Sequence, residues 1–290
     1  MQIIPSLHSI STRFDALFCD IWGCIHNGVT SFSAAVHSLQ QFRHDGGAVL
    51  LLTNAPRPWQ DVKRQISLLG VPDNAWDVIL SSGDVAKAAL FAGRVGTRVF
   101  HIGPERDSGF FTPDGFVDNR NIERVSFDEA EGIVCTGLFD DDHESPEDYR
   151  KFLFQAAARK MPFLCANPDR IVYRGNRKIH CAGAISDLYT ALGGDVLMFG
   201  KPRAAIYHLA RKRLQDIRSQ SVADDRILCV GDNVATDLKG AVEQSLPSLF
   251  VLGGLAASLL DTESRPDPSR VKSFFDRHGV EPDYVISHLC

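Results

Sequence analysis

Two candidate functional sites in the first sixty residues each follow a short run of apolar residues. Asp20 ends the run ALFCD, where its carboxylate could serve as a nucleophile or as a metal ligand. Thr53 and Asn54 end the run LLLTN, and a hydroxyl and an amide can both donate to phosphate oxygens. On each segment alone a structural role is equally open, because Asp20 could cap a turn and Thr-Asn pairs are common in turns.

One basic and two acidic residues follow similar apolar runs in the last third of the chain. Lys201, in Gly-Lys-Pro after LMF, places a cation at the start of a helix-like segment, where it could meet an anion or only solvent. Asp232 and Asp237 follow ILCV in the stretch CVGDNVATD. Paired carboxylates at a strand end suit a hard cation that keeps water ligands, which favours Mg²⁺ over a soft metal. A helix cap is the alternative, but these acids would then repel Asp20 across the sheet.

The segments around these residues alternate between strand-like and helix-like patterns. Between residues 15 and 90 the strand-like runs are ALFCDIW, GAVLLLTN and WDVILSS, each followed by a helix-like segment. The alternation returns after about residue 195, with VLMFG, RILCVGD, SLFVLGG and DYVIS. This pattern predicts right-handed crossovers onto a doubly wound parallel sheet, at whose carboxyl edge the polar residues would meet. We therefore expect one α/β core built from residues 1–80 and 195–290.

The segment between these two blocks is predicted to be an inserted α/β domain. It has strand-like runs of its own, RVFHIG, GIVCTG, PFLCAN and RIVYRGNRKIHC, separated by helix-like stretches. We assign residues 81–194 to this insertion.

Composition excludes several classes of protein. The chain has 290 residues, 44% of them hydrophobic, which is typical of a globular protein. Its formal charge of −5 leaves no basic surplus for a nucleic acid, and no apolar run reaches the length of a membrane span. Its seven cysteines are scattered without a CxxC pair, which favours reduced cytoplasmic thiols over disulfides or zinc ligands.

The order of these motifs resembles the haloacid dehalogenase (HAD) superfamily of hydrolases. An acid, a hydroxyl, a lysine and paired acids follow one another, each at the end of its own strand. The likeness extends from about residue 15 to the terminal strand near 284. The segments CANPDRIVYRG and HCAGAI resemble landmarks of the class IIA cap, found in NagD-like and 4-nitrophenylphosphatase-like enzymes. The resemblance implies a HAD core with an inserted cap of the C2 type.

The resemblance also implies a reaction and a cofactor. Asp20 would accept a phosphoryl group as an aspartyl-phosphate, while Thr53 and Lys201 hold that group during transfer. Asp20, Asp232 and Asp237 would bind Mg²⁺. The expected substrate is a small phosphorylated metabolite such as a sugar or polyol phosphate, and members with this cap pair through it as homodimers. Such a site fits the chemistry, because cations and aligned donors stabilise the charge that spreads over a phosphoryl group in flight.

One residue departs from the family pattern. Phosphatases of this family carry a second aspartate two residues after the nucleophile, as the general acid and base, and this chain has Trp22 there. An indole cannot exchange that proton, and loss of such a group costs about 10²- to 10⁴-fold in rate. The main-chain carbonyl of Trp22 could still bind Mg²⁺, as it does in the family. His26, in the loop that follows, is the nearest residue that could replace the acid, although a loop histidine is commonly only solvated.

Three interpretations of the departure remain open. The chain could be a phosphatase whose substrate has a good leaving group or whose proton comes from elsewhere. It could be a phosphohydrolase with altered chemistry on an unusual substrate. It could also be a regulatory protein that binds phosphate and Mg²⁺ with little turnover.

Three further residues are candidates for substrate binding. Arg57, just beyond the second motif, could meet a second acidic group on the substrate, or it could be an exposed arginine at a helix start. Asn167 and Asp169, on the predicted cap, could face the substrate, or they could form an Asx turn.

Overall fold

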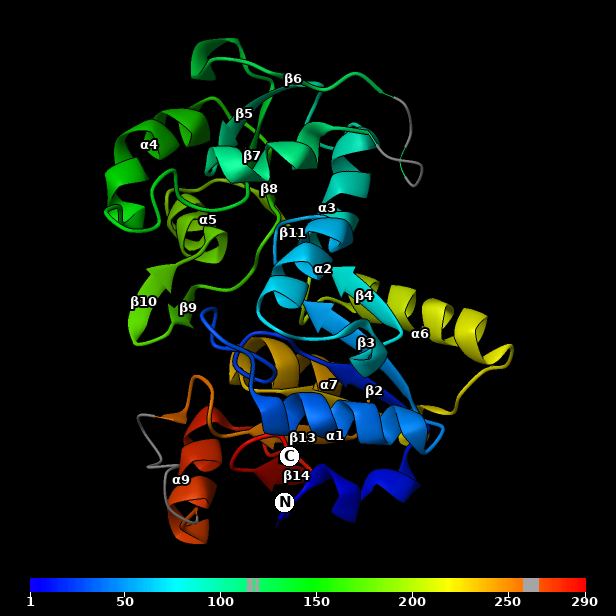
Figure 1. Cartoon of the computed structure of the whole chain (residues 1–290). Coiled ribbons are helices and arrows are strands. Elements are labelled where there is room, and N and C mark those ends of the chain that lie inside the picture. Colours follow the sequence, from blue (N-terminus) through cyan, green and yellow to red (C-terminus); the bar gives the residue numbers. More distant parts are fainter. Residues whose placement is uncertain (114–116, 118–119, 258–265) are drawn as a thin grey trace.

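A fully parallel sheet of seven strands forms the lower half of the protein (Figure 1). The structure is a computed structural model that describes residues 1–113, 117, 120–257 and 266–290. In spatial order the strands are β1 (Gln2–Ile3), β14 (Tyr284–Ile286), β13 (Ser248–Val251), β12 (Ile227–Gly231), β2 (Ala16–Cys19), β3 (Ala48–Thr53) and β4 (Val78–Ser81). The order reverses between β2 and β12, as in a doubly wound fold, so the predicted α/β fold class is confirmed.

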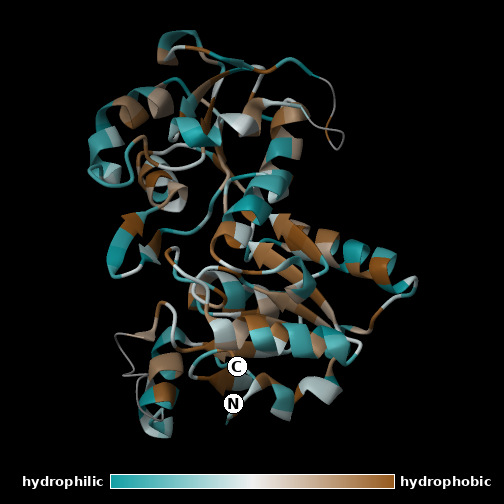
Figure 2. Ribbon diagram, viewed as in Figure 1, coloured by the Kyte–Doolittle hydropathy of each residue, from teal (hydrophilic) through white to brown (hydrophobic). Residues whose placement is uncertain are grey.

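Helices cover both faces of this sheet. Leu17 and Cys19 face the cluster that includes α1 (Ser33–His44) and α2 (Trp59–Leu68). Ala16 and Phe18 point the other way, toward α6 (Ala204–Arg218) and α7 (Lys239–Glu243). The last helix, α9 (Pro268–His278), packs against β13. The strands are therefore apolar on both faces, and Figure 2 shows their hydrophobic colouring against the polar outer faces of the helices.

A second parallel sheet of five strands lies above the first in Figure 1. Its order is β11 (Val196–Met198), β8 (Phe163–Cys165), β7 (Gly132–Cys135), β5 (Arg98–Ile102) and β6 (Glu123–Arg124). Helices α4 (Arg150–Ala158) and α5 (Ala182–Ala191) pack on one face, and α3 (Ser82–Phe91) packs on the other. We call residues 82–198, from α3 through β11, the cap.

One strand lies in a different sheet from the one that we predicted. The run VLMFG was assigned to the core with residues 195–290, but β11 pairs in parallel with β8 of the cap, Val196 opposite Phe163. That prediction was wrong because a short apolar run specifies a strand without specifying its neighbour. The chain therefore returns to the core after β11, directly before Lys201.

A two-stranded antiparallel hairpin extends from the cap toward the core. It consists of β9 (Ile171–Arg174) and β10 (Arg177–His180). Its turn contacts the loop after β2, because the Gly175 amide donates to the Asn27 carbonyl at 3.0 Å. Among the described residues, no helix is both long and apolar enough to span a bilayer. All seven cysteines are unpaired, and Cys290 alone of them is exposed.

Candidate active site

Three predicted site residues lie side by side at the carboxyl edge of the core sheet. Asp20, Thr53 and Asp232 end or follow β2, β3 and β12, which are neighbours in the sheet. All three side chains are buried. The Asp20 amide donates to the Val230 carbonyl at 2.8 Å, which continues the pairing of β2 with β12 as far as the carboxylate. The sheet itself therefore fixes the positions of these groups.

Lys201 also lies at this edge. It belongs to the segment after β11, where the chain returns from the cap to the core. Its ammonium nitrogen is 2.5 Å from Asp20 Oδ1 and 2.7 Å from Asp237 Oδ1, and it donates to the Leu52 carbonyl at 2.8 Å. Burial alone would lower the pKa of Lys201, but the two carboxylates raise it well above its ordinary value. The lysine is therefore a fully satisfied, buried cation between two acids.

Asn54 joins the core to the cap. Its side-chain oxygen accepts from the Lys201 amide at 2.8 Å. Its amide nitrogen donates to Asp169 Oδ1 at 2.9 Å and to the Lys201 carbonyl at 3.2 Å. Both of its N–H groups are thus used within the protein, so the arrangement gives Asn54 a positioning role in place of the predicted contact with substrate.

The carboxylates of Asp20 and Asp232 are close enough to share a cation. Together with the Cys24 thiol, their ligand atoms lie within 4.8 Å of one another. Burial raises the pKa of Asp20 to about 7 and that of Asp232 well above its ordinary value. Burial also raises the pKa of Cys24, and a protonated thiol is no ligand for a hard cation. Two buried carboxylates fit Mg²⁺, which would offset their charge.

Glycines make room for the Asp232 side chain. A Cβ atom at Gly23 would lie 2.1 Å from Asp232 Oδ2, and one at Gly254 would lie 1.9 Å from it. The same oxygen accepts from the Leu255 amide at 2.8 Å. The Gly253-Gly254 loop therefore shapes the site, which our sequence reasoning missed. Its signal is a glycine pair one residue beyond the strand β13, at the edge where ligands bind.

A cavity of about 680 Å³ opens between the carboxyl edge of the core and the hairpin of the cap. It is lined from the core by Asp20, Thr53, Lys201, Asp232 and Asp237, and from the cap by Asp169 and residues of β9. The predicted catalytic and metal-binding side chains thus line one partly open cavity.

Trp22 contacts the cap. Its indole N–H donates to the Tyr173 carbonyl of β9 at 2.7 Å. Its ring stands edge-on to His26, with centroids 5.0 Å apart, and a Cβ atom at Gly28 would lie 2.4 Å from it. The residue that occupies the family's acid position therefore holds the hairpin against the core.

The structure does not place His26 as a proton donor to the cavity around Asp20. His26 is buried, and its Nδ1 accepts from the Gly28 amide at 3.0 Å. Burial lowers its pKa to about 4, so it is neutral at pH 7. The sequence suggested a solvated loop here, whereas Trp22 and the surrounding chain bury the ring.

The remaining candidates lie along the boundary of the cap. Asn167 accepts from the Asp169 amide at 3.0 Å, which is the predicted Asx turn. Asp169 lines the cavity around Asp20, and burial raises its pKa to about 6. Arg57 lines a second, adjoining cavity and bonds to the Gln65 amide oxygen at 2.5 Å.

A doubly wound sheet with acids and a lysine at its carboxyl edge, beneath an inserted second sheet, defines a capped hydrolase with an acidic active site. Two protein-family models match this chain, and both describe hydrolases. One described as haloacid dehalogenase-like hydrolase matches residues 17–116, and a HAD-hydrolase-like one matches residues 198–289. The chain belongs to the haloacid dehalogenase-like hydrolase family.

Several known proteins are similar to this chain in sequence and in structure. A haloacid dehalogenase-like hydrolase from Brucella suis 1330 is 42% identical, with a TM-score of 0.87 over 99% of this chain and 100% of that one. The D-glycerol 3-phosphate phosphatase of Mycobacterium tuberculosis (strain ATCC 25618 / H37Rv) is 30% identical over 86% of this chain, which spans 66% of that relative. A glycerol phosphate phosphatase structure from the same species, in complex with magnesium, is 26% identical, with a TM-score of 0.64 over 96% of this chain and 76% of that one.

Trp22→Phe should loosen the hairpin. The substitution keeps an aromatic ring beside His26 but removes the N–H that donates to the Tyr173 carbonyl, a bond worth about 0.5–1.5 kcal/mol. Hydrogen exchange of a peptide spanning 171–180 should accelerate about 2- to 10-fold. Trp59→Phe on α2 is the control and should leave that peptide unchanged. Equal protection in both variants would show that the indole bond does not hold the cap.

Proposed function

We propose that this chain is a Mg²⁺-dependent phosphohydrolase that transfers the phosphoryl group of a small sugar or polyol phosphate to Asp20 and then to water. One observation carries the proposal: the buried Asp20 carboxylate lies 2.5 Å from a buried lysine and shares a metal-sized space with Asp232. The relatives named as glycerol phosphate phosphatases support the substrate class. A cytoplasmic location and pairing through the cap remain predictions.

The first step is attack by Asp20. A carboxylate oxygen bonds to phosphorus as the bond from phosphorus to the leaving oxygen breaks, which yields an aspartyl-phosphate. Lys201 holds Asp20 in place and balances the charge on the phosphoryl oxygens. The Thr53 hydroxyl accepts from the Ala55 amide at 3.1 Å, so its hydrogen is available to a phosphoryl oxygen. Mg²⁺ would supply further charge stabilisation, with Asp20 and Asp232 as ligands and Asp237 and the Trp22 carbonyl as the other proposed ones.

The leaving oxygen needs a proton that Trp22 cannot give. We assign this role to Asp169, which lines the cavity from the cap and, among the described residues, is the carboxyl there outside the Asp20, Asp232 and Asp237 group. Its Oδ1 is fixed by Asn54, and burial raises its pKa to about 6, so a fraction is protonated near neutral pH. After donating, the Asp169 carboxylate can accept a proton from the water that attacks the aspartyl-phosphate, which releases phosphate and restores Asp20.

Asp20→Asn should abolish turnover. An amide cannot form the phosphoenzyme, so phosphate release from p-nitrophenyl phosphate and from a panel of sugar and polyol phosphates should fall by about 10⁴-fold or more. Removal of divalent cations should have a comparable effect on wild type. Asp45→Asn, at an exposed position after α1, is the control and should turn over like wild type. Phosphate binding without measurable turnover in wild type would favour a regulatory binding protein instead.

Asp169→Asn should slow the reaction according to the leaving group. For glycerol 3-phosphate, whose alkoxide must be protonated, kcat/KM should fall about 10²- to 10⁴-fold. For p-nitrophenyl phosphate, whose phenolate leaves without a proton, the loss should be much smaller. Asp187→Asn, an exposed cap position paired with Arg170, should change neither value. Equal losses on both substrates would mean that Asp169 only positions Asn54.

A further inference from the structure

A second cavity, of about 310 Å³, adjoins the first. Four residues line both cavities: Trp22, Thr53, Asp169 and Val172. The walls of the second cavity carry three arginines, Arg57 from the core and Arg106 and Arg174 from the cap, and three aspartates, Asp107, Asp141 and Asp169. We call this space the arginine chamber. It shares the side chains of Thr53 and Asp169 with the cavity around Asp20.

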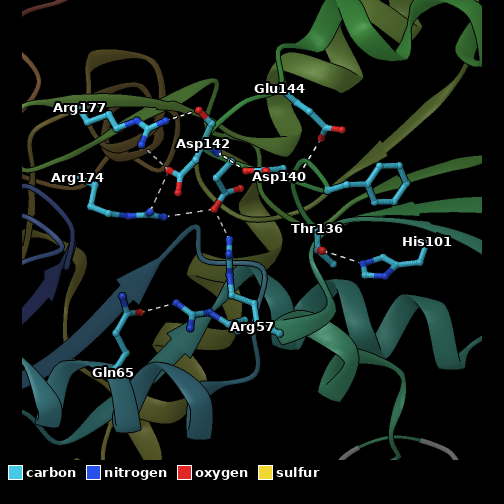
Figure 3. Close-up of polar contacts among 12 residues, drawn as sticks. Arg57, Gln65, His101, Thr136, Asp140, Asp142, Glu144, Arg174 and Arg177 are labelled. Carbon is cyan, nitrogen blue, oxygen red and sulfur yellow. Dashed lines mark hydrogen bonds and ion pairs between the residues drawn. The ribbon is translucent and has the colours of Figure 1, made fainter.

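The three arginines differ in whether an aspartate pairs with them. Arg106 and Arg174 both pair with Asp141, the latter at 3.3 Å. Arg174 and Arg177 also flank Asp142, as Figure 3 shows. Arg57, in contrast, donates to the neutral amide of Gln65, as Figure 3 shows, and among the residues that the structure describes it forms no direct ion pair. The nearby carboxylate of Asp107 acts on it only through space.

Arg57 is thus a cation without a direct ion pair among the described residues, and it lines the second cavity. Burial lowers its pKa, but a guanidinium remains charged at neutral pH. Its guanidinium group is planar, and two of its N–H groups can bind the two oxygens of a carboxylate or a phosphate at once. An anionic oxygen group in the arginine chamber would form the direct ion pair that Arg57 does not make with any of the described residues.

A buried acceptor in the same chamber points independently to a ligand. Asp107 is only 4% exposed, and its Oδ1 atom is buried without a hydrogen-bond partner. Its carboxyl group bonds to the Thr136 hydroxyl. An unsatisfied buried oxygen is costly, so this atom is expected to meet a donor from water or from a bound molecule. A hydroxyl group of a ligand would supply that donor.

We propose that the arginine chamber binds the leaving group of the substrate, and that this group carries a second anionic oxygen function, held by Arg57, together with a hydroxyl held by Asp107. The inference rests on the proposed phosphohydrolase function and narrows its substrates to phosphorylated hydroxy acids or bisphosphates. The volume suits this class, since 310 Å³ has room for about ten water-sized groups.

Matched substrates test the second anionic group. We expect 3-phosphoglycerate to exceed glycerol 3-phosphate in kcat/KM by about 10- to 100-fold, chiefly through KM, because a charge-assisted pair is gained. 6-Phosphogluconate against sorbitol 6-phosphate extends the comparison to longer acids. Fructose 1,6-bisphosphate against fructose 6-phosphate shows whether a phosphate serves in place of a carboxylate. No preference in any pair would overturn the proposal.

The hydroxyl is tested by removing it from the substrate. The phosphate ester of 3-hydroxypropionate is 3-phosphoglycerate without its free hydroxyl. We expect kcat/KM for this ester to be about 3- to 10-fold lower than for 3-phosphoglycerate, because one hydrogen bond is lost. An equal kcat/KM for the two compounds would contradict the role of Asp107.

Arg57→Gln should remove the preference for acidic substrates, and Arg57→Lys should keep part of it because the charge remains without the paired N–H groups. Arg64→Gln, at an exposed position on α2, the helix that follows Arg57, is the control and should keep both the activity and the preference of wild type. A preference that survives in Arg57→Gln would show that another group binds the acid. If Arg57→Gln does not fold, the lysine variant decides, because an unchanged preference there contradicts bidentate binding.

A binding measurement separates this proposal from the proposed function. Asp20→Asn protein is titrated calorimetrically with 3-phosphoglycerate and with glycerol 3-phosphate. A preference for the acid of about 10-fold or more supports the arginine chamber even if wild type shows no turnover. Turnover on p-nitrophenyl phosphate with equal affinity for the two ligands would retain the phosphohydrolase and overturn the chamber.

Discussion

The buried contact between Lys201 and Asp20 is the interaction on which the rest of the site depends. Asp20, Asp232 and Asp237 bring three carboxylates to one buried edge, and like charges in such a place repel strongly. Lys201 lies between Asp20 and Asp237 and neutralises part of that charge. Because Lys201 is at the point where the chain returns from the cap, the insertion must end close to the nucleophile. The position of the cap is thus tied to the electrostatics of the core.

Trp22 adds a second link between core and cap. Its indole N–H is bonded to a carbonyl of β9, and Asn54 joins Lys201 to Asp169 on the other side of the same cavity. A position that the family uses for proton transfer is used here for contact with the cap. The carboxyl that we assign to proton transfer, Asp169, belongs to the cap itself. In this account, chemistry requires the cap to be docked, which also excludes water from the aspartyl-phosphate until the leaving group departs.

The sequence predicted the parts of the site that depend on a single strand. Asp20, Thr53 and Asp232 each follow an apolar run, and parallel alternation is enough to bring such residues to one edge. The sequence could not assign β11 to a sheet, because nothing in its three half-buried residues indicates which strand pairs with it. Nor could it show that His26 is buried, or that Asp107 and Arg57 line the same cavity. These features arise where cap and core meet, and the Tyr173 carbonyl that binds Trp22 has no signature in the sequence at all.

We propose that Asp20 carries the phosphoryl group during turnover. The most direct measurement is a rapid acid quench of wild-type protein with p-nitrophenyl phosphate and Mg²⁺, followed by proteolysis and mass spectrometry of the peptide that contains Asp20. We expect one phosphoryl group on that carboxylate, present during turnover and absent once substrate is exhausted. Turnover without any phosphorylated peptide, or with the phosphoryl group on another residue, would contradict it.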